Sequence, residues 1–258
     1  MPFVNEWEPL LFGNRAGTKA TPGLGVSFVQ ANAAETAVVL SDGHSLALNQ
    51  QLSTHGIAGV VWNCARAMIE FLQHQVGAEE LRGKRVVELG AGTGAVGLAL
   101  ALHAPLESLV LTDLVNVTAL LEQNVRRAAK DHKAIDHLAG RDRLQVVTYC
   151  WGTPAATKSA LLGNDVILCS DCLYEPSLYQ DLLSSLIELT KSSATVFLAY
   201  KQRHPERERA FFTAASSTFS ISVMAQDDQI TAQEWLNDSI FICRLHRILP
   251  TTLQLWSK

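Results

Sequence analysis

The sequence predicts an α/β fold in which helices cover both faces of one largely parallel sheet, a doubly wound arrangement. Three observations carry this prediction. From Arg85 onward, short apolar runs alternate with longer amphipathic stretches, as strand–helix units do. A glycine-rich loop follows the first run, and the last two runs have no long helix between them. We therefore expect a mixed sheet of seven strands.

The first five apolar runs are the predicted parallel strands, and the stretches between them are the predicted helices. The strands fall at residues 85–89, 108–112, 144–149, 165–169 and 194–200. The helices fall at about 94–103, 116–132, 177–191 and 205–217. Two further strands are expected at 219–224 and 240–245, and at least one of them should join the sheet antiparallel.

The region before Arg85 predicts smaller elements. Residues 25–30, 37–40 and 45–48 have the pattern of a small β meander. Residues 60–72 carry apolar side chains at helical spacing, so we expect a helix there that packs on the sheet.

Length and composition fit one globular domain. The 258 residues are 48% hydrophobic and 18% charged, which is enough to bury a full core. No repeat or long linker divides the chain. We expect a single domain over residues 1–258, with an N-terminal β extension over 1–58 and a Rossmann-like core over 59–258.

Charge and hydropathy argue against several classes of partner. The formal net charge is −4, and no run of more than two consecutive basic residues is present to neutralise phosphates. The longest unbroken apolar stretch, residues 95–102, is far shorter than the roughly 20 residues of a membrane span. The acidic N-terminal residues do not resemble a secretory signal, and five cysteines fit a reducing compartment. We expect a cytoplasmic or nuclear monomer that binds neither nucleic acid nor membrane.

Gly90, Gly92 and Gly94 form a loop between the first core strand and the helix after it. Glycine permits positive φ and close approach of a ligand to the backbone, and the helix N-terminus beyond the loop offers free N–H groups. A nucleotide-like ligand fits this context. The alternative is a tight turn that merely requires glycine, which three alternate glycines after an apolar strand make the weaker interpretation.

Two carboxylates suggest which nucleotide-like ligand the loop binds. Asp113 ends the second strand, 19 residues after Gly94, close to the separation at which a carboxylate binds ribose hydroxyls. A helix cap is the alternative role for Asp113. The loop also matches the dinucleotide fingerprint formally. However, Glu88 beside the loop would repel a pyrophosphate more than an amino-acid-bearing sulfonium, which favours S-adenosyl-L-methionine over NAD.

Asp171 and Tyr174 follow the fourth strand, whose carboxyl end borders the same crevice. Methyl transfer to an amine needs a partner for the amine's charge and hydrogens and a site that excludes water. A carboxylate and an aromatic hydroxyl can provide both. A helix cap is the alternative for Asp171. Cys169 and Cys172 have the spacing of a zinc or redox pair, but no second pair or nearby histidine completes a zinc site, so we expect no metal.

Trp62 and Trp151 lie before the first core strand and just after the third. An indole face can stack on adenine and attract a cationic sulfonium. The alternative is a core tryptophan, above all for Trp62, which falls within the predicted helix.

As a set, these motifs resemble the seven-β-strand protein-lysine methyltransferases of the methyltransferase-21-like group. The resemblance rests on Gly59–Trp62, Val87–Gly94, Leu111–Asp113, Asn124, Tyr149–Trp151 and Asp171–Tyr174. It implies the class I methyltransferase fold, S-adenosyl-L-methionine as cofactor and a protein substrate that presents a lysine. It also implies cofactor contacts by Trp62, Glu88, Gly90, Asp113 and Trp151, with Asp171 and Tyr174 facing the lysine. We add the neighbouring Gly92, Gly94, Leu114 and Ser170 to the expected cofactor contacts.

Within that group, Gly94–Leu98, Ser170–Tyr174 and Tyr200–Arg203 look most similar to the branch that modifies the AAA ATPase called valosin-containing protein. The resemblance therefore implies a substrate of that type. Two other functions stay open. The same fold can methylate a small molecule or a nucleic acid, although Cys172 and Leu173 replace both prolines of the Asn/Asp-Pro-Pro-aromatic motif found in enzymes that methylate base amines. The chain could also be a catalytically inactive binding module.

Overall fold

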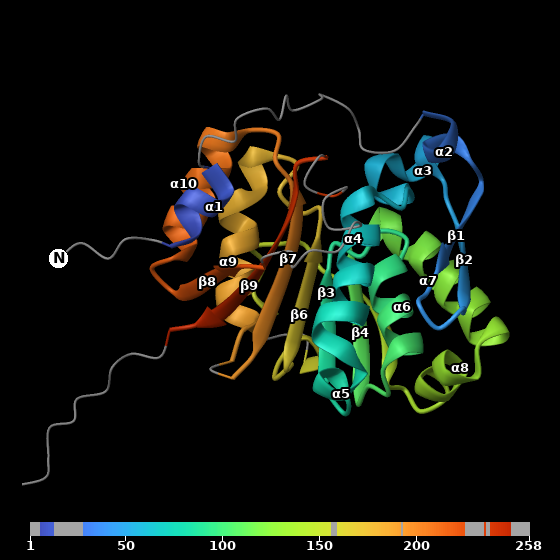
Figure 1. Ribbon diagram of the computed structural model, residues 1–258. Coiled ribbons are helices and arrows are strands. Elements are labelled where there is room, and N and C mark those ends of the chain that lie inside the picture. The colour runs from blue at the N-terminus through green and yellow to red at the C-terminus, as the bar shows by residue number, and fades with distance from the viewer. Residues whose placement is uncertain are drawn as a thin grey trace, which may run out of the picture.

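The computed structural model describes residues 6–12, 28–155, 159–191, 193–224, 235 and 238–248 (Figure 1). Its main sheet has the strand order β5-β4-β3-β6-β7-β9-β8. The strands are β3 (Arg85–Leu89), β4 (Ser108–Asp113), β5 (Leu144–Thr148), β6 (Val166–Ser170), β7 (Thr195–Lys201), β8 (Phe219–Val223) and β9 (Ile240–Arg247). All seven predicted strands are confirmed, and the tail pairs antiparallel as expected, β9 with β7 and β8 with β9.

Helices cover both faces of this sheet (Figure 1). On one face lie α4 (Asn63–Phe71), α5 (Gly77–Leu81), α6 (Ala95–His103), α7 (Val115–Asp131) and α8 (Lys133–Ala139). On the other lie α1 (Trp7–Phe12), α9 (Tyr179–Leu189) and α10 (Pro205–Ala215). The four predicted core helices are therefore confirmed to within a few residues, whereas α1, α5 and α8 were not expected.

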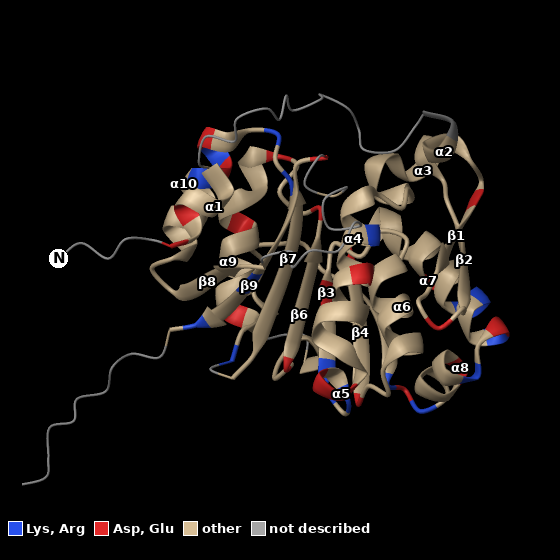
Figure 2. Ribbon diagram, in the orientation of Figure 1, with Lys and Arg blue, Asp and Glu red and all other residues tan. Residues whose placement is uncertain are grey.

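The two hydrophobic cores follow from the alternation of side chains along each strand. In β6, Val166 and Leu168 join the core that contains residues of α4 and α6, while Ile167 and Cys169 join the core of α9 and α10. Strands that are buried on both faces in this way appear in the sequence as continuous apolar runs. In Figure 2 the charged residues are scattered over helices and loops, and the strands are mostly uncharged.

The chain reverses its winding direction between the neighbouring parallel strands β3 and β6. The connection after β3 runs through α6 on one face, and the connection after β6 runs through α9 on the opposite face. Open α/β sheets bind ligands in the crevice that such a reversal leaves at the carboxyl ends of the strands. The fold thus places residues that follow β3, β4, β6 and β7 around one crevice.

The N-terminal part differs from the prediction. Residues 28–30 of the strand expected at 25–30 belong instead to a short helix, α2 (Phe28–Asn32), and residues 25–27 lie outside the described ranges. The expected meander is therefore a two-stranded antiparallel hairpin in the described structure, β1 (Glu35–Val39) and β2 (Ser45–Asn49).

Asn124 of α7 connects this hairpin to the glycine loop. Its side-chain oxygen accepts the Asn49 N–H at 2.8 Å, and its amide donates to the carbonyls of Asn49 and Thr93. Asn124 is fully buried. One amide thus fixes the hairpin, α7 and the loop relative to one another.

In the segment before β3, the helix begins later than predicted. The predicted helix at 60–72 begins only at Asn63, and Trp62 is the extended residue immediately before it. Before Trp62 lie α3 (Leu52–His55) and a 3-10 turn at Gly56–Gly59, and after α4 a π-helical turn spans Leu72–Val76. Because Trp62 precedes the helix, its side chain is not part of the helix's apolar face.

Within the described ranges, no helix is long and apolar enough to cross a membrane.

Gly94→Ala tests how tightly the strand-to-helix turn is packed. Gly94 has a φ of +80°, and a Cβ there would lie 2.7 Å from Cδ1 of the fully buried Leu121. Alanine would incur about 1–2 kcal/mol for the left-handed backbone and about 1–3 kcal/mol for overpacking. Gly83, with a φ of +67° and open space around it, is the matched control. In urea unfolding, Gly94→Ala should lose more stability than Gly83→Ala; equal losses would contradict this packing.

Candidate active site

One cavity of about 290 Å³ lies at the carboxyl ends of β3, β4 and β6. Ten of the eleven predicted site residues line it: Trp62, Glu88, Gly90, Gly92, Asp113, Leu114, Trp151, Ser170, Asp171 and Tyr174. The fold therefore brings together side chains that lie more than 100 residues apart in sequence. Residues that sequence reasoning did not assign to the site also line it, notably Ile57, Asp181 and Arg203.

The glycine loop approaches neighbouring backbone and side chains closely. A Cβ on Gly92 would lie 2.7 Å from the Ala58 carbonyl oxygen, and one on Gly90 would lie 3.0 Å from the Trp151 indole. Both residues also have positive φ. Glycine is therefore required there both by the backbone conformation and by the lack of space for a Cβ. Gly94 does not line the cavity, and it serves the turn into α6 instead.

Asp113 ties the end of β4 to the glycine loop. Its Oδ2 accepts the Gly92 N–H at 2.7 Å, and its Oδ1 accepts the Leu114 N–H at 2.8 Å. Burial raises the pKa of this carboxyl despite these two hydrogen bonds, which act in the opposite direction. Each carboxylate oxygen has a second lone pair, so Asp113 can still accept hydrogen bonds from a ligand in the cavity.

Glu88 is a buried carboxyl at the floor of the cavity. Its Oε2 accepts the Gly97 N–H at 2.8 Å. Burial raises the Glu88 pKa to about 8, the Gly97 hydrogen bond opposes this rise, and the nearby Asp113 charge adds to it. A cationic ligand group beside Glu88 would favour its ionised form.

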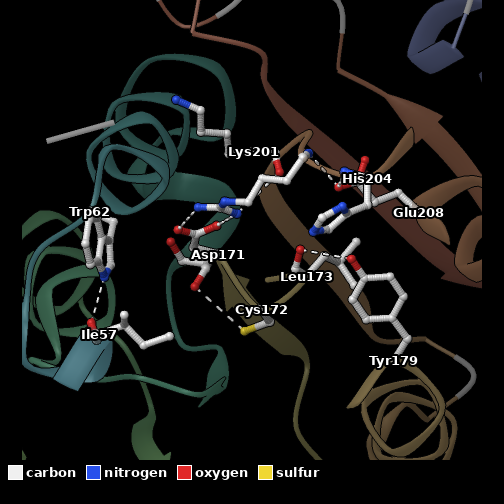
Figure 3. Close-up of polar contacts among 11 residues, drawn as sticks. Ile57, Trp62, Asp171, Cys172, Leu173, Tyr179, Lys201, His204 and Glu208 are labelled. Atoms are coloured by element: carbon white, nitrogen blue, oxygen red, sulfur yellow. Dashed lines mark hydrogen bonds and ion pairs between the residues drawn. The ribbon is translucent and has the colours of Figure 1, made fainter. Parts of the chain in front are cut away.

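Aromatic and polar side chains complete the walls. The half-buried Trp62 donates its indole N–H to the Ile57 carbonyl at 2.7 Å, which fixes the ring beside the cavity (Figure 3). Trp151 packs against Gly90. Ser170 Oγ is buried and has no hydrogen-bond partner among the described residues, so it is available to a ligand.

Asp171 and Tyr174 line the same cavity, as their spacing predicted. Asp171 has a φ of +58°, an unusual conformation for a residue other than glycine. Its carboxylate is already engaged by Arg203, whose guanidinium donates to Oδ1 at 2.7 Å and to Oδ2 at 3.0 Å. Sequence reasoning quoted Arg203 within a matching motif without giving it a role. The pairing depends on the adjacency of β6 and β7, which sequence spacing alone does not reveal.

Cys169 and Cys172 are both buried. The Cys172 thiol donates to the Leu89 carbonyl at 3.3 Å, and the proximity of Cys169 together with burial raises the Cys172 pKa. Among the described residues, no group of three or more His, Cys, Asp or Glu side chains could hold a metal ion.

The residues present fit S-adenosyl-L-methionine. The glycine loop leaves room that a Cβ would fill, Asp113 offers lone pairs to a ribose, and Glu88 offers a carboxylate to a cationic group. The two indoles provide faces for adenine and for a sulfonium. A doubly wound seven-stranded sheet with this site is the class I methyltransferase arrangement, and that class uses S-adenosyl-L-methionine.

Comparison with known proteins identifies a family within the class I methyltransferases. The chain belongs to the lysine methyltransferase family, whose model matches residues 40–218. The protein N-lysine methyltransferase METTL21A of Danio rerio is 33% identical over 187 residues, which cover 72% of this chain and 79% of that protein. EEF1A lysine methyltransferase 3 of Mus musculus is 28% identical over 210 residues, which cover 81% of this chain and 82% of that protein.

Asp113→Ala should weaken S-adenosyl-L-methionine binding at least tenfold. It removes charge-assisted hydrogen bonds to the ribose, worth about 1.5–3 kcal/mol each, and it releases the Gly92 N–H. Calorimetric titration measures the change, with Asp136→Ala on the exposed face of α8 as the control. Unchanged affinity in Asp113→Ala, or tight binding of NAD by the unaltered chain, would contradict the assignment.

Glu88→Gln should alter how stability depends on pH. The Glu88 pKa is about 8 in the folded protein without ligand, well above the ordinary glutamate value of about 4.5. Between these values the folded state holds a proton that the unfolded state releases, so Glu88 lowers the free energy of unfolding as pH rises from about 5 to about 8. Urea titrations at several pH values should show this loss in the unaltered chain and less of it in Glu88→Gln. Parallel curves would mean that Glu88 does not titrate in this range.

Proposed function

We propose that the chain is an S-adenosyl-L-methionine-dependent protein-lysine N-methyltransferase that acts on a lysine of a folded protein. One observation supports this most directly: Asp171 and Tyr174 share a single cavity with the glycine loop. Tyr174 is 37% exposed, so this part of the cavity reaches solvent, from which the side chain of another protein can enter.

On this proposal, the floor of the cavity holds the cofactor. Bound S-adenosyl-L-methionine supplies a methyl group attached to a positively charged sulfur. Asp113 accepts hydrogen bonds from the ribose, and Glu88 faces a cationic part of the molecule. Trp62 and Trp151 exclude water and attract positive charge to their ring faces. Because these groups are fixed before binding, little reorganisation is needed at the time of reaction.

The target lysine enters beside Tyr174, and Asp171 accepts an N–H hydrogen bond from its amine. Burial raises the pKa of the Tyr174 hydroxyl, which therefore stays protonated and can donate a hydrogen bond. Holding the amine in one orientation next to the methyl group is the main catalytic contribution expected from these residues. The amine must have lost its proton before it can attack.

We further propose an AAA ATPase of the valosin-containing type as the first substrate to test. Three matching motifs support this choice, namely Gly94–Leu98, Ser170–Tyr174 and Tyr200–Arg203. The relative named for its action on EEF1A makes that protein the second candidate. A cytoplasmic or nuclear location and a monomeric state stay predictions.

Labelled methyl transfer into a cell lysate tests the function. The purified chain is incubated with lysate and with S-adenosyl-L-methionine that carries a tritiated methyl group, and aliquots are then digested with protease or nuclease. We expect label in protein that protease removes and nuclease does not, with the methyl group on a lysine after hydrolysis. Label in nucleic acid or small molecules would favour the other substrate classes, and no label would favour an inactive binding module.

Asp171→Asn should separate catalysis from cofactor binding. It replaces one of the two carboxylate oxygens that hold Arg203 with an NH2 group at nearly constant shape, so methyl transfer should fall about a hundredfold, the scale of a positioned polar group. Cofactor affinity should stay within about threefold, because Asp171 faces the lysine and not the cofactor. Rates and calorimetric titrations are compared with those of Tyr174→Phe, which deletes only a hydroxyl and should cost less. Lost cofactor binding in Asp171→Asn, with full turnover in Tyr174→Phe, would overturn both roles.

A further inference from the structure

A two-point ion pair occupies the wall of the cavity where the proposed lysine binds. Both carboxylate oxygens of Asp171 contact the Arg203 guanidinium, at 2.7 Å and 3.0 Å, and Figure 3 shows these contacts at Asp171. The side chains are 11% and 25% exposed, respectively. Arg203 therefore lies within direct reach of any group that approaches Asp171.

The backbone at two adjacent strand ends holds both partners. Asp171 directly follows β6, and its N–H donates to the Ala199 carbonyl of β7 at 2.8 Å. The Arg203 N–H donates to Glu208 Oε1 at 2.7 Å, and the His204 N–H donates to the same atom at 2.9 Å (Figure 3). Glu208 is fully buried in α10, so the two hydrogen bonds fix the turn at residues 203–204 to that helix. The ion pair is thus built into the fold and does not depend on two mobile side chains meeting.

Titratable groups from several elements surround the pair. The Cys64 thiol of α4 lies within hydrogen-bond reach of Asp171, and burial together with the Asp171 charge raises its pKa, so it is a neutral neighbour. Burial disfavours the charged form of Arg203 and so lowers its pKa. The hydrogen bonds and the charge of Asp171 outweigh this effect, and the Arg203 pKa is raised. The other charged or titratable groups that act on the pair or lie beside it are Cys172, Tyr174, Tyr179, Lys201, His204 and Glu208.

This pairing changes what Asp171 does to a lysine. A lone carboxylate in a poorly solvated site stabilises an ammonium over an amine and so raises the lysine pKa, which is already about 10.4 in water. Such a site would bind the unreactive form. A carboxylate neutralised by a guanidinium exerts much less of this effect, yet its remaining lone pairs still accept an N–H hydrogen bond. The positive sulfur of the methyl donor disfavours an ammonium further.

We propose that Arg203 is a positioning residue that holds Asp171 as half of a neutral ion pair, so that the target lysine is bound as the free amine. The inference rests on the proposed lysine methylation. In the reaction the amine lone pair forms the new N–C bond while the C–S bond breaks and its electrons go to sulfur. The proton that the lysine loses goes to solvent before attack, and the methylated product leaves as the cation.

Two Arg203 variants test this role, with the protein that takes up label in the lysate experiment as the substrate. Arg203→Met leaves the Asp171 charge unpaired, so at pH 7.5 kcat should fall at least tenfold while KM does not rise. The loss should shrink as pH increases, and the midpoint of the pH–rate profile should move up by about one unit. Arg203→Lys keeps the charge without the fork geometry, so it should restore the pH profile even where the rate stays reduced.

Lys191→Met is the matched control. It breaks the Lys191–Asp165 ion pair, which is more exposed than the Arg203–Asp171 pair and lies at the opposite ends of the strands. Neither kcat nor its pH profile should change in this variant. If Arg203→Met lowers the rate by the same factor at every pH, Arg203 is merely structural and the proposal is wrong.

Proton release on binding gives a second readout that needs no turnover. With S-adenosylhomocysteine bound, the substrate protein is titrated at pH 8 in two buffers of different ionisation enthalpy. The unaltered chain should release about one proton per substrate bound, and Arg203→Met should release much less. A substrate with its target lysine changed to methionine should release none with either chain. Equal release by both chains would overturn the Arg203 role, whereas failure of the unaltered chain to methylate any lysine would overturn the proposed function itself.

Discussion

The reversal of winding between β3 and β6 is the constraint on which the site depends. Because α6 and α9 leave these neighbouring strands toward opposite faces, a crevice opens at the carboxyl ends between them. The glycine loop follows β3, Asp171 follows β6, and Asp113 is the last residue of the neighbouring β4. A cavity at this position is a consequence of topology, and the side chains that line it then decide its chemistry.

Charge is balanced differently in the two parts of this cavity. At the floor, Glu88 and Asp113 are buried carboxyls without cationic side-chain partners among the hydrogen bonds described, and burial raises the pKa of both. This part suits a ligand that brings its own positive charge. At the wall, Asp171 already has a cation in Arg203. That part suits a neutral donor of N–H hydrogen bonds, such as a deprotonated lysine.

Local patterns were enough to predict most of the fold and many of the residues that line the cavity. Continuous apolar runs marked the strands because parallel strands are buried on both faces, and the loop glycines stood out because positive φ and close approach require them. Local patterns failed where a partner from elsewhere decides the outcome. Phe28–Asn32 forms a helix where a strand was predicted, and Trp62 lies immediately before the helix that was predicted to contain it. The Arg203–Asp171 pair joins residues 32 positions apart through the adjacency of two strands.

A crystal structure of the chain with S-adenosylhomocysteine tests the central claim most directly, because it locates the cofactor relative to both parts of the cavity. We predict ribose hydroxyls within hydrogen-bond distance of Asp113 and the adenine against an indole face. The sulfur should face the intact Asp171–Arg203 pair, with Tyr174 beside the opening. If S-adenosylhomocysteine binds outside this cavity, or if its sulfur faces away from Asp171, the claim that a single crevice serves both the cofactor and the lysine is wrong.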